Sequence, residues 1–439
     1  MMYQKYDAYK DSGVQWLGNI PNNWEVYALK RLINGCVNGL WGNDPKSNEN
    51  DIVVLRVADF NRETLTINND KLTLRNIKKQ EYGKRLLSQG DLLIEKSGGG
   101  DKTLVGCVVL FNEEYDALTS NFVGKMTPIK SVNNQFLNYV FATLYANDIN
   151  YVSIKQTTGI QNLDIDTYLS EKFCFPSLKE QEKIVLFLNK KTTQIDQAIV
   201  TKEQQIALLN ERKQIVIQQA VTKGLDINVK MKDSGVEWIG QIPEHWGVFA
   251  NRAIFSERNE SGRDGLPLLS VSIHTGVSDE EMDEDTNVQG RVKIEDKSKY
   301  ILVKKGDIAF NMMRAWQGAI GAVSVDGMVS PAYIVAKPTE RIDANFFEYQ
   351  YRCPEFIQQM GRYSKGITDF RKRLYWDGFK QLSTLVPPIS EQLKIIEFIK
   401  ALNNQIETVV SVKTQQIQKL KEYKTTLIND AVTGKIKVT

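Results

Sequence analysis

A seventeen-residue phrase occurs twice in the sequence, and this repeat constrains the fold more than any other feature. Residues 10–26 return as residues 232–248 with eleven identities, and four of the seven tryptophans lie in the two copies. A second phrase recurs in the same order, since residues 176–184 match residues 387–395. Together they predict two copies of one unit of about 220 residues. The segments between the phrases differ in sequence, so we expect a shared fold with different surfaces.

A long helix is predicted after each copy of the second phrase, beginning just after proline and ending near Gly224 and Gly434. Residues 178–221 contain no glycine or proline, and apolar residues recur along one face at helical spacing. The second helix can bury its apolar face only by running back along the first, so an antiparallel coiled-coil seam is predicted. The predicted seam residues are Ile184, Leu188, Ile195, Ile199, Ile206, Leu209, Val216, Ile395, Ile399, Ile406, Val410, Ile417, Leu420 and Leu427.

The segments between the repeated phrases carry short β-type runs and predict mixed α/β domains. The predicted strands are 53–57, 92–95, 107–111, 268–273, 308–311 and 319–325. The expected fold class is α+β, internally duplicated, with two mixed α/β domains separated by the two long antiparallel helices. The predicted boundaries are 1–175 for the first domain, 176–225 for the first helix, 226–386 for the second domain and 387–439 for the second helix.

Composition places the chain among ordinary folded proteins. Lysine and arginine outnumber aspartate and glutamate by only 56 to 53, so a basic surface must come from local clustering. The four cysteines, Cys36, Cys107, Cys174 and Cys353, have no CxxC spacing, which argues against a zinc site and for buried thiols in a reducing compartment. The sequence has no signal-peptide core and no run long enough to span a bilayer, so a cytoplasmic protein is expected.

Motifs for catalysis are missing from the sequence. It contains no Walker-type phosphate loop, no glycine-rich dinucleotide fingerprint and no proline-containing tetrad of an amino-methyltransferase. The two histidines, His245 and His274, lack metal-ligand or triad spacing and are expected at the surface. Residues 295–297, Glu-Asp-Lys, resemble the tail of a nuclease motif, but such triplets are common in charged loops. No metal, cofactor or catalytic residue is therefore predicted in this chain.

Signals for nucleic-acid binding occur in both variable segments. Residues 96–102 follow a predicted strand and place flexible backbone N–H groups between two lysines, which suits contact with phosphate. The corresponding residues 311–318 combine amide, guanidinium and indole groups, and such amides and guanidinium groups read adenine and guanine. The predicted DNA-binding residues of the first segment are Arg56, Lys96, Ser97, Gly98, Lys102, Lys155, Gln156, Thr158 and Gln161. Those of the second are Asn311, Arg314, Trp316, Gln317, Ser364, Lys365, Arg371 and Arg373. The alternatives are a glycine-rich hairpin, a partly buried tryptophan and solvated charge.

The repeated phrases resemble those of the specificity subunits of type I restriction-modification systems. Asp-Ser-Gly-x-x-Trp-x-Gly-x-Ile-Pro-x-x-Trp stands at 11–24 and 233–246, and Pro-x-x-x-Glu-Gln opens each long helix at 176–181 and 387–392. The resemblance covers essentially the whole chain. It implies two target-recognition domains, each reading one half of a bipartite asymmetric sequence in double-stranded DNA.

The resemblance also implies partners for the chain. The helices would dock two methyltransferase subunits, and two ATP-dependent restriction subunits would join that core. S-adenosylmethionine, ATP and Mg²⁺ are then expected on the partner subunits, with no membrane involved. The alternatives are a duplicated solitary DNA methyltransferase or nuclease, which would need the missing motifs, and a scaffold that does not bind DNA.

Overall fold

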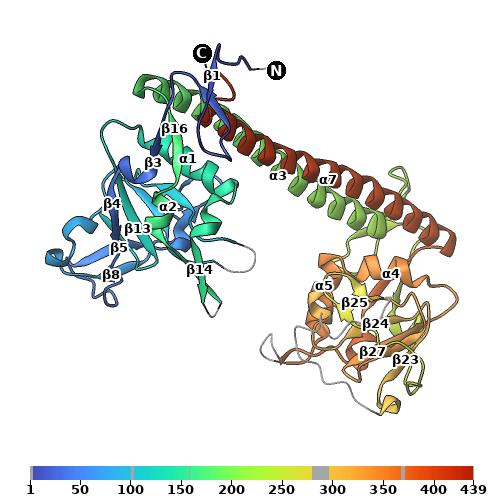
Figure 1. The fold of residues 1–439 in the computed structure, drawn as a ribbon. Helices are drawn as coiled ribbons and strands as arrows, with labels where there is room; N and C mark the ends of the chain where they lie inside the picture. The colour runs from blue at the N-terminus through green and yellow to red at the C-terminus, as the bar shows by residue number, and fades with distance from the viewer. Residues whose placement is uncertain (1–2, 100–102, 158, 279–295, 367–370, 439) are drawn as a thin grey trace. The chain divides into compact units, whose positions relative to one another are not determined.

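The computed structural model describes residues 3–99, 103–157, 159–278, 296–366 and 371–438. The chain divides into two compact units (Figure 1). Unit 1 contains residues 1–202 and 414–439, and unit 2 contains residues 203–413. Each unit therefore holds one end of each long helix together with one set of strands.

The strands of unit 1 form several small sheets. A four-stranded antiparallel sheet has the order β11(Val108–Leu110), β9(Leu92–Glu95), β13(Val123–Pro128), β4(Ile33–Asn38). Two three-stranded sheets have the orders β12(Ala117–Thr119), β5(Asp51–Leu55), β8(Leu74–Asn76) and β10(Ser97–Gly98), β15(Ile160–Leu163), β14(Ile154–Thr157). The paired strands are β1(Tyr9–Asp11) with β2(Asn19–Pro21), β3(Glu25–Ala28) with β16(Lys172–Phe175), and β6(Phe60–Asn61) with β7(Thr66–Ile67). The short helices are α1(Asn134–Ala146) and α2(Ile165–Leu169).

Unit 2 repeats the central part of this arrangement. Its four-stranded sheet has the order β25(Ile320–Ala322), β24(Ile308–Asn311), β27(Tyr333–Pro338), β20(Phe255–Glu257), which matches the order in unit 1. The paired strands are β17(Met231–Asp233) with β18(Gln241–Pro243), β19(Gly247–Ala250) with β28(Ser383–Val386), β21(Val271–Ser272) with β22(Gly276–Val277), and β23(Ile301–Val303) with β26(Gly327–Val329). The short helices are α4(Ala344–Tyr351), α5(Pro354–Tyr363) and α6(Trp376–Phe379). The predicted strands 92–95 and 308–311 coincide with β9 and β24.

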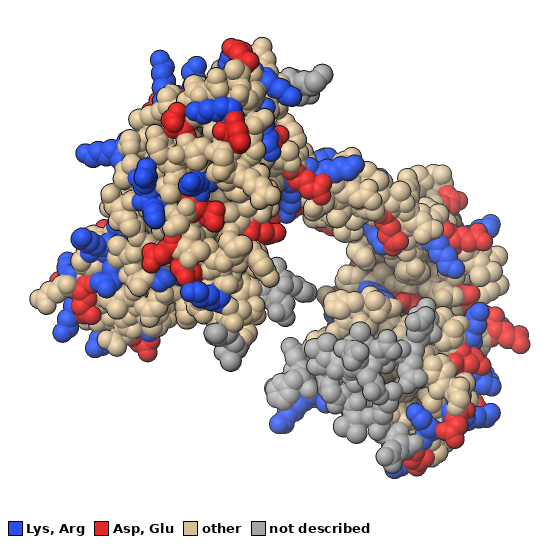
Figure 2. Space-filling model, in the orientation of Figure 1, with Lys and Arg blue, Asp and Glu red and all other residues tan. Residues whose placement is uncertain are grey.

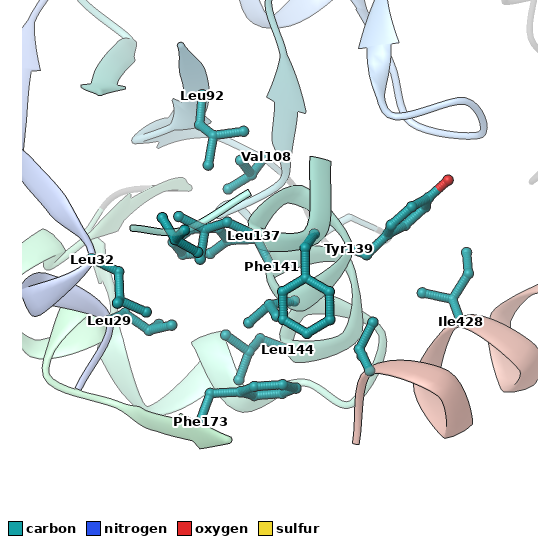
Figure 3. Packing of buried hydrophobic residues seen from close by; sticks show 14 of the residues in the cluster. Leu29, Leu32, Leu92, Val108, Leu137, Tyr139, Phe141, Leu144, Phe173 and Ile428 are labelled. Atoms are coloured by element: carbon teal, nitrogen blue, oxygen red, sulfur yellow. The ribbon is translucent and has the colours of Figure 1, made fainter. Parts of the chain in front are cut away.

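The core of unit 1 forms around α1. Asn133 caps this helix, because its side chain accepts a hydrogen bond from the backbone N–H of Phe136 at 3.0 Å. In Figure 3 the side chains of α1 lie among residues from strands and loops, with Ile428 of α7(Ile389–Val432) beside them. The labelled residues are Leu29, Leu32, Leu92, Val108, Leu137, Tyr139, Phe141, Leu144, Phe173 and Ile428. Burying each large apolar side chain stabilises the unit by about 1.5–3 kcal/mol.

The long helices are α3(Leu178–Lys223) and α7(Ile389–Val432), each beginning just after proline. In unit 1 Asp196 binds Lys424 at 2.8 Å, and Lys202 donates to Gln416 at 2.7 Å. Residue numbers thus rise along α3 as they fall along α7, so the two segments are antiparallel. In unit 2 the same direction holds, since Lys413 donates to Gln205 at 2.6 Å and Lys213 lies 3.8 Å from Glu407. The predicted α+β class with long antiparallel helices is therefore confirmed.

The fourteen predicted seam residues all lie at buried or half-buried positions. The buried ones are Ile184, Leu188, Ile195, Ile199, Ile395, Ile399, Ile406 and Leu427. The half-buried ones are Ile206, Leu209, Val216, Val410, Ile417 and Leu420. Of the half-buried ones, Ile417 and Leu420 pack against the core of unit 1.

The repeated phrases meet within each unit, which gives a physical reason for their joint recurrence. Trp24 and Trp246 are fully or almost fully buried. The indole N–H of Trp24 donates to Glu180 at 3.3 Å, and that of Trp246 donates to Glu391 at 3.1 Å. Each glutamate belongs to the Glu-Gln pair at the start of a long helix. The first phrase therefore fixes each domain to the helix that follows it.

In each unit the end of the other long helix also reaches the buried tryptophan: the end of α7 reaches Trp24, and the end of α3 reaches Trp246. A Cβ on Gly434 would lie 2.4 Å from Pro21 and 3.4 Å from Trp24, and one on Gly224 would lie 3.0 Å from Glu391 and 3.4 Å from Trp246. Both glycines have positive φ, 73° and 78°, as helix ends often require. The C-terminal segment thus returns to the first domain as predicted, and Lys437 N–H donates to Gln4 O at 2.7 Å.

Candidate nucleic-acid interface

In unit 1 the two predicted clusters of DNA-binding residues lie on neighbouring strands. Ser97 and Gly98 of β10 pair with Asn162 and Gln161 of β15. The backbone N–H of Lys96 donates to Phe122 O, and its carbonyl accepts from Leu163, both at 2.8 Å. Residues 96–98 therefore form one surface with residues 154–157 and 160–163, although more than fifty positions separate the two parts in the sequence.

The predicted side chains of this surface differ in their availability. Gln156 is exposed, and Lys155 is exposed while paired with Asp164 at 2.7 Å. That hydrogen bond from Lys155 is the main cause that lowers the pKa of the Asp164 carboxyl. The half-exposed Arg56 is paired with the buried Asp59 at 3.0 Å, and the half-buried Lys96 donates to the side chain of Asn38. Lys102 and Thr158 lie outside the described residues.

Gln161 has a structural position rather than the exposed one that base reading requires. Its side chain is only 5 % exposed, and its amide oxygen accepts from the backbone N–H of Val105 at 3.1 Å. A Cβ on Gly99 would lie 2.8 Å from the same oxygen, so the glycine allows the loop to pass close to Gln161. The geometry therefore suits support of the 96–99 loop.

In unit 2 the two predicted clusters also come together. Leu374 N–H donates to Met312 O at 2.8 Å, and Lys365 and Arg373 exchange backbone hydrogen bonds at 2.8 Å. The ammonium group of Lys372 lies 5.0 Å from the centre of the Trp316 ring, which is a cation–π distance. The 311–318 loop and residues 364–373 therefore form one surface in this unit, with residues 367–370 outside the described part.

Arg314 and Gln317 are the most available polar side chains of this second surface. Both are exposed, and within the described part of the chain neither side chain has a hydrogen-bond or ion-pair partner. Asn311 is 5 % exposed and accepts from Met313 N–H at 2.9 Å, so its side chain shapes the loop. Trp316 is half-buried and donates its indole N–H to Met313 O at 3.0 Å. Ser364 donates to Met360 O at 2.7 Å at the end of α5, while Arg371 is exposed.

Sequence reasoning missed the apolar members of the unit 1 surface. Phe122 and Ile160 are exposed large apolar side chains beside the predicted polar groups. With Trp41 they line a pocket of about 480 Å³ that also contains Arg56, Ser97 and Gly98. The only signal in the sequence was Phe122 in the polar turn 119–122, Thr-Ser-Asn-Phe, and a single exposed aromatic residue is too common to indicate a site.

Charge is mixed on the face of each unit that Figure 2 draws. Figure 2 shows lysine and arginine interspersed with aspartate and glutamate over the face that it draws. Local groups such as Lys155 and Arg314 therefore matter more than a general positive field.

Among the described residues no group of histidine, cysteine and carboxylate side chains is arranged to hold a metal ion. Burial raises the pKa of the Cys36 and Cys107 thiols to about 11, and that of the Cys174 and Cys353 thiols to about 12. All four thiols are free, and three are fully buried. His245 and His274 are exposed. No helix in the described ranges is long and apolar enough to cross a membrane.

Comparison with known proteins finds similarity to one family. Residues 21–208 match the type I restriction modification DNA specificity domain. A Methanocaldococcus jannaschii protein provisionally named the specificity subunit of the type I restriction enzyme MjaX is 24 % identical over 100 % of this chain and 99 % of its own. The MjaVIII specificity subunit of the same organism is 24 % identical over 68 % of this chain and 70 % of its own.

Two solved structures share the fold. One, from work on complex assembly and conformational transition of the type I R-M system, has a TM-score of 0.64 and 13 % identity. It covers 94 % of this chain and 98 % of the other. The HsdS subunit of Thermoanaerobacter tengcongensis has a TM-score of 0.53 and 14 % identity over 95 % and 98 % of the two chains. With its repeated frame and a match to one specificity subunit that spans 100 % of its length, the chain is similar to the specificity subunits of type I restriction-modification systems.

Proposed function

We propose that each unit reads one half of a bipartite, asymmetric DNA sequence. The observation that supports this most is the gathering of exposed polar and cationic side chains on the same part of a duplicated fold. Gln156 and Lys155 stand on it in unit 1, and Arg314 and Gln317 stand on it in unit 2. The frame residues recur while these side chains differ, as two readers of different sequences require.

The proposed contacts divide by chemistry. The backbone N–H groups and lysines of residues 96–99 and 155 position the phosphate backbone, whereas Arg314 and Gln317 contact base edges. Gln161 and Asn311 support their loops in this proposal, because both side chains are buried and hydrogen-bonded. The proposed boundaries follow the repeated phrases. The target-recognition domains are residues 1–175 and 226–386, and the spacer helices are residues 176–225 and 387–439.

The long helices carry the proposed docking sites for two methyltransferase subunits. α3 exposes Leu186, Val200, Leu208 and Ile215, and α7 exposes Leu393, Phe398, Val409 and Val412. Apolar side chains on the outer face of a paired helix gain stability when a partner covers them. S-adenosylmethionine then belongs to those partners, and ATP and Mg²⁺ belong to two restriction subunits that join the complex in the cytoplasm.

Methylome sequencing tests the proposal directly. A host lacking other DNA methylation is given this chain together with the methyltransferase encoded with it. We expect a single methylated motif made of two short specified parts separated by unspecified bases. Methylation without the chain, or a motif of one continuous part, would contradict bipartite reading.

A further inference from the structure

The apolar pocket of unit 1 has an environment that suits one particular base. Its volume is about 480 Å³, and its apolar lining includes Trp41, Val57, Phe122 and Ile160. Phe122 is 57 % exposed and Ile160 is 53 % exposed, so both leave apolar surface in water. A ligand that covers them with an apolar group gains free energy in proportion to the area removed from water.

A buried hydroxyl completes the pocket. Ser120 lines it and is only 2 % exposed, yet its Oγ has no hydrogen-bond partner among the described residues. The backbone of this turn is fixed, since Ser120 N–H donates to Leu55 O at 2.8 Å and Val123 N–H donates to Ser120 O at 3.0 Å. Buried hydroxyls are usually satisfied, so this one suits a ligand that brings an acceptor into the pocket.

The charge around the pocket favours nucleic acid as the ligand. The half-exposed Arg56 lines the pocket together with Ser97 and Gly98 of β10. Lys96, next to them, is joined through its backbone to Phe122. A cationic and backbone-rich margin around an apolar floor suits a base edge flanked by phosphates.

Only one of the four DNA bases presents a methyl group and a hydrogen-bond acceptor side by side in the major groove. Thymine carries its C5-methyl group next to the O4 acceptor, whereas cytosine has an amino donor and no methyl group. We propose that this pocket reads a thymine in the first half-site. Its methyl group packs against Trp41, Phe122 and Ile160, and the Ser120 hydroxyl donates to O4. The inference rests on the proposed function and specifies one of its base contacts.

The test measures binding of the wild-type chain, in complex with its methyltransferase, to synthetic duplexes. Each duplex carries the motif found by methylome sequencing and contains no modified cytosine. The first half-site is the one that changes when residues 27–175 are exchanged. Each of its thymines is replaced in turn by deoxyuridine, which removes only the methyl group. We expect about fourfold weaker binding at one position, which corresponds to about 0.8 kcal/mol for one buried methyl group.

Variants then locate the effect. Phe122→Ala combined with Ile160→Ala should remove the difference between thymine and deoxyuridine. Met313→Ala, which truncates an exposed apolar side chain in unit 2, should retain it. Ser120→Ala should weaken both duplexes by the same factor, roughly two- to tenfold, because O4 is present in both bases.

The proposal is overturned if no deoxyuridine in the first half-site weakens binding, or if the weakening persists in the Phe122→Ala, Ile160→Ala variant. The first result would also fit Phe122 acting as a wedge between bases. In either case the wild-type complex should still bind its target duplex more tightly than a scrambled duplex. Equal affinity for the two duplexes would instead contradict the proposed function itself.

Discussion

The two units share a frame and differ where they are proposed to meet DNA. In unit 1 the residues after β9 are Lys96, Ser97 and a run of glycines, and they adjoin an apolar pocket. In unit 2 the residues after β24 include Met313, Arg314, Trp316 and Gln317, and the Trp316 ring packs with Lys372. The strand that precedes both loops occupies the same position in the same sheet order.

This difference teaches that position on the fold and side-chain chemistry vary independently. Trp24 with Glu180, and Trp246 with Glu391, hold each domain in the same way at nearly the same distance. The loops after β9 and β24 do not hold the domains to the helices, so their side chains can change with the DNA sequence that they read.

The largest effect is expected from substitutions that disrupt the frame shared by the two units. Trp24→Ala should destabilise unit 1 by about 3–5 kcal/mol, because it leaves a cavity in a fully packed site. Trp246→Ala should destabilise unit 2 by a similar amount. Chemical denaturation, monitored with a probe in each unit, measures both losses of stability. Trp316→Ala, at a half-buried position, serves as the control. A loss in one unit several kcal/mol larger than in the other would contradict an equivalent frame.

A smaller effect should distinguish base recognition by unit 2 from base recognition by unit 1. Arg314→Ala with Gln317→Ala should relax one or two positions of the second half-site, with each good base contact contributing about 1–3 kcal/mol. The first half-site should remain unchanged, because both residues lie in unit 2. Methylome sequencing of the variant gives the result. An unchanged motif would show that these exposed side chains do not read bases.

The smallest effect concerns phosphate contact in unit 1. Lys96→Ala should weaken binding to all sequences alike and reduce the slope of log K against log salt by about one unit. Titration at several salt concentrations, on the target and on a scrambled duplex, measures the change. Lys190→Ala, which truncates an exposed lysine of α3 in unit 1, serves as the control. A loss confined to the target duplex would assign Lys96 to base reading instead.

Much of the fold followed from periodicity and repetition. The helix starts near Pro176 and Pro387 and the glycines near their ends predicted α3 and α7 to within a few residues. The short strands were harder, because β5 starts before the predicted range and β21 spans only part of 268–273. Sheet order depends on contacts between distant segments, which a single sequence does not reveal.

The candidate site could be predicted only in outline. Glycine and lysine patterns located the loops, but they could not show that Gln161 and Asn311 turn inward to hold backbone N–H groups. Nor could they reveal that residues 41, 120, 122 and 160 converge on one pocket. Such convergence arises from tertiary packing, whereas the signals in the sequence are local.

The central claim is that each unit specifies its half-site independently on a common frame. The measurement that tests it most directly is the methylated motif of a complex in which residues 27–175 come from another specificity subunit. Residues 249–386 are exchanged in the reciprocal complex. Each exchange is predicted to change one half-site and retain the other, with different half-sites changed in the two complexes. A change of both half-sites by either exchange would contradict the claim.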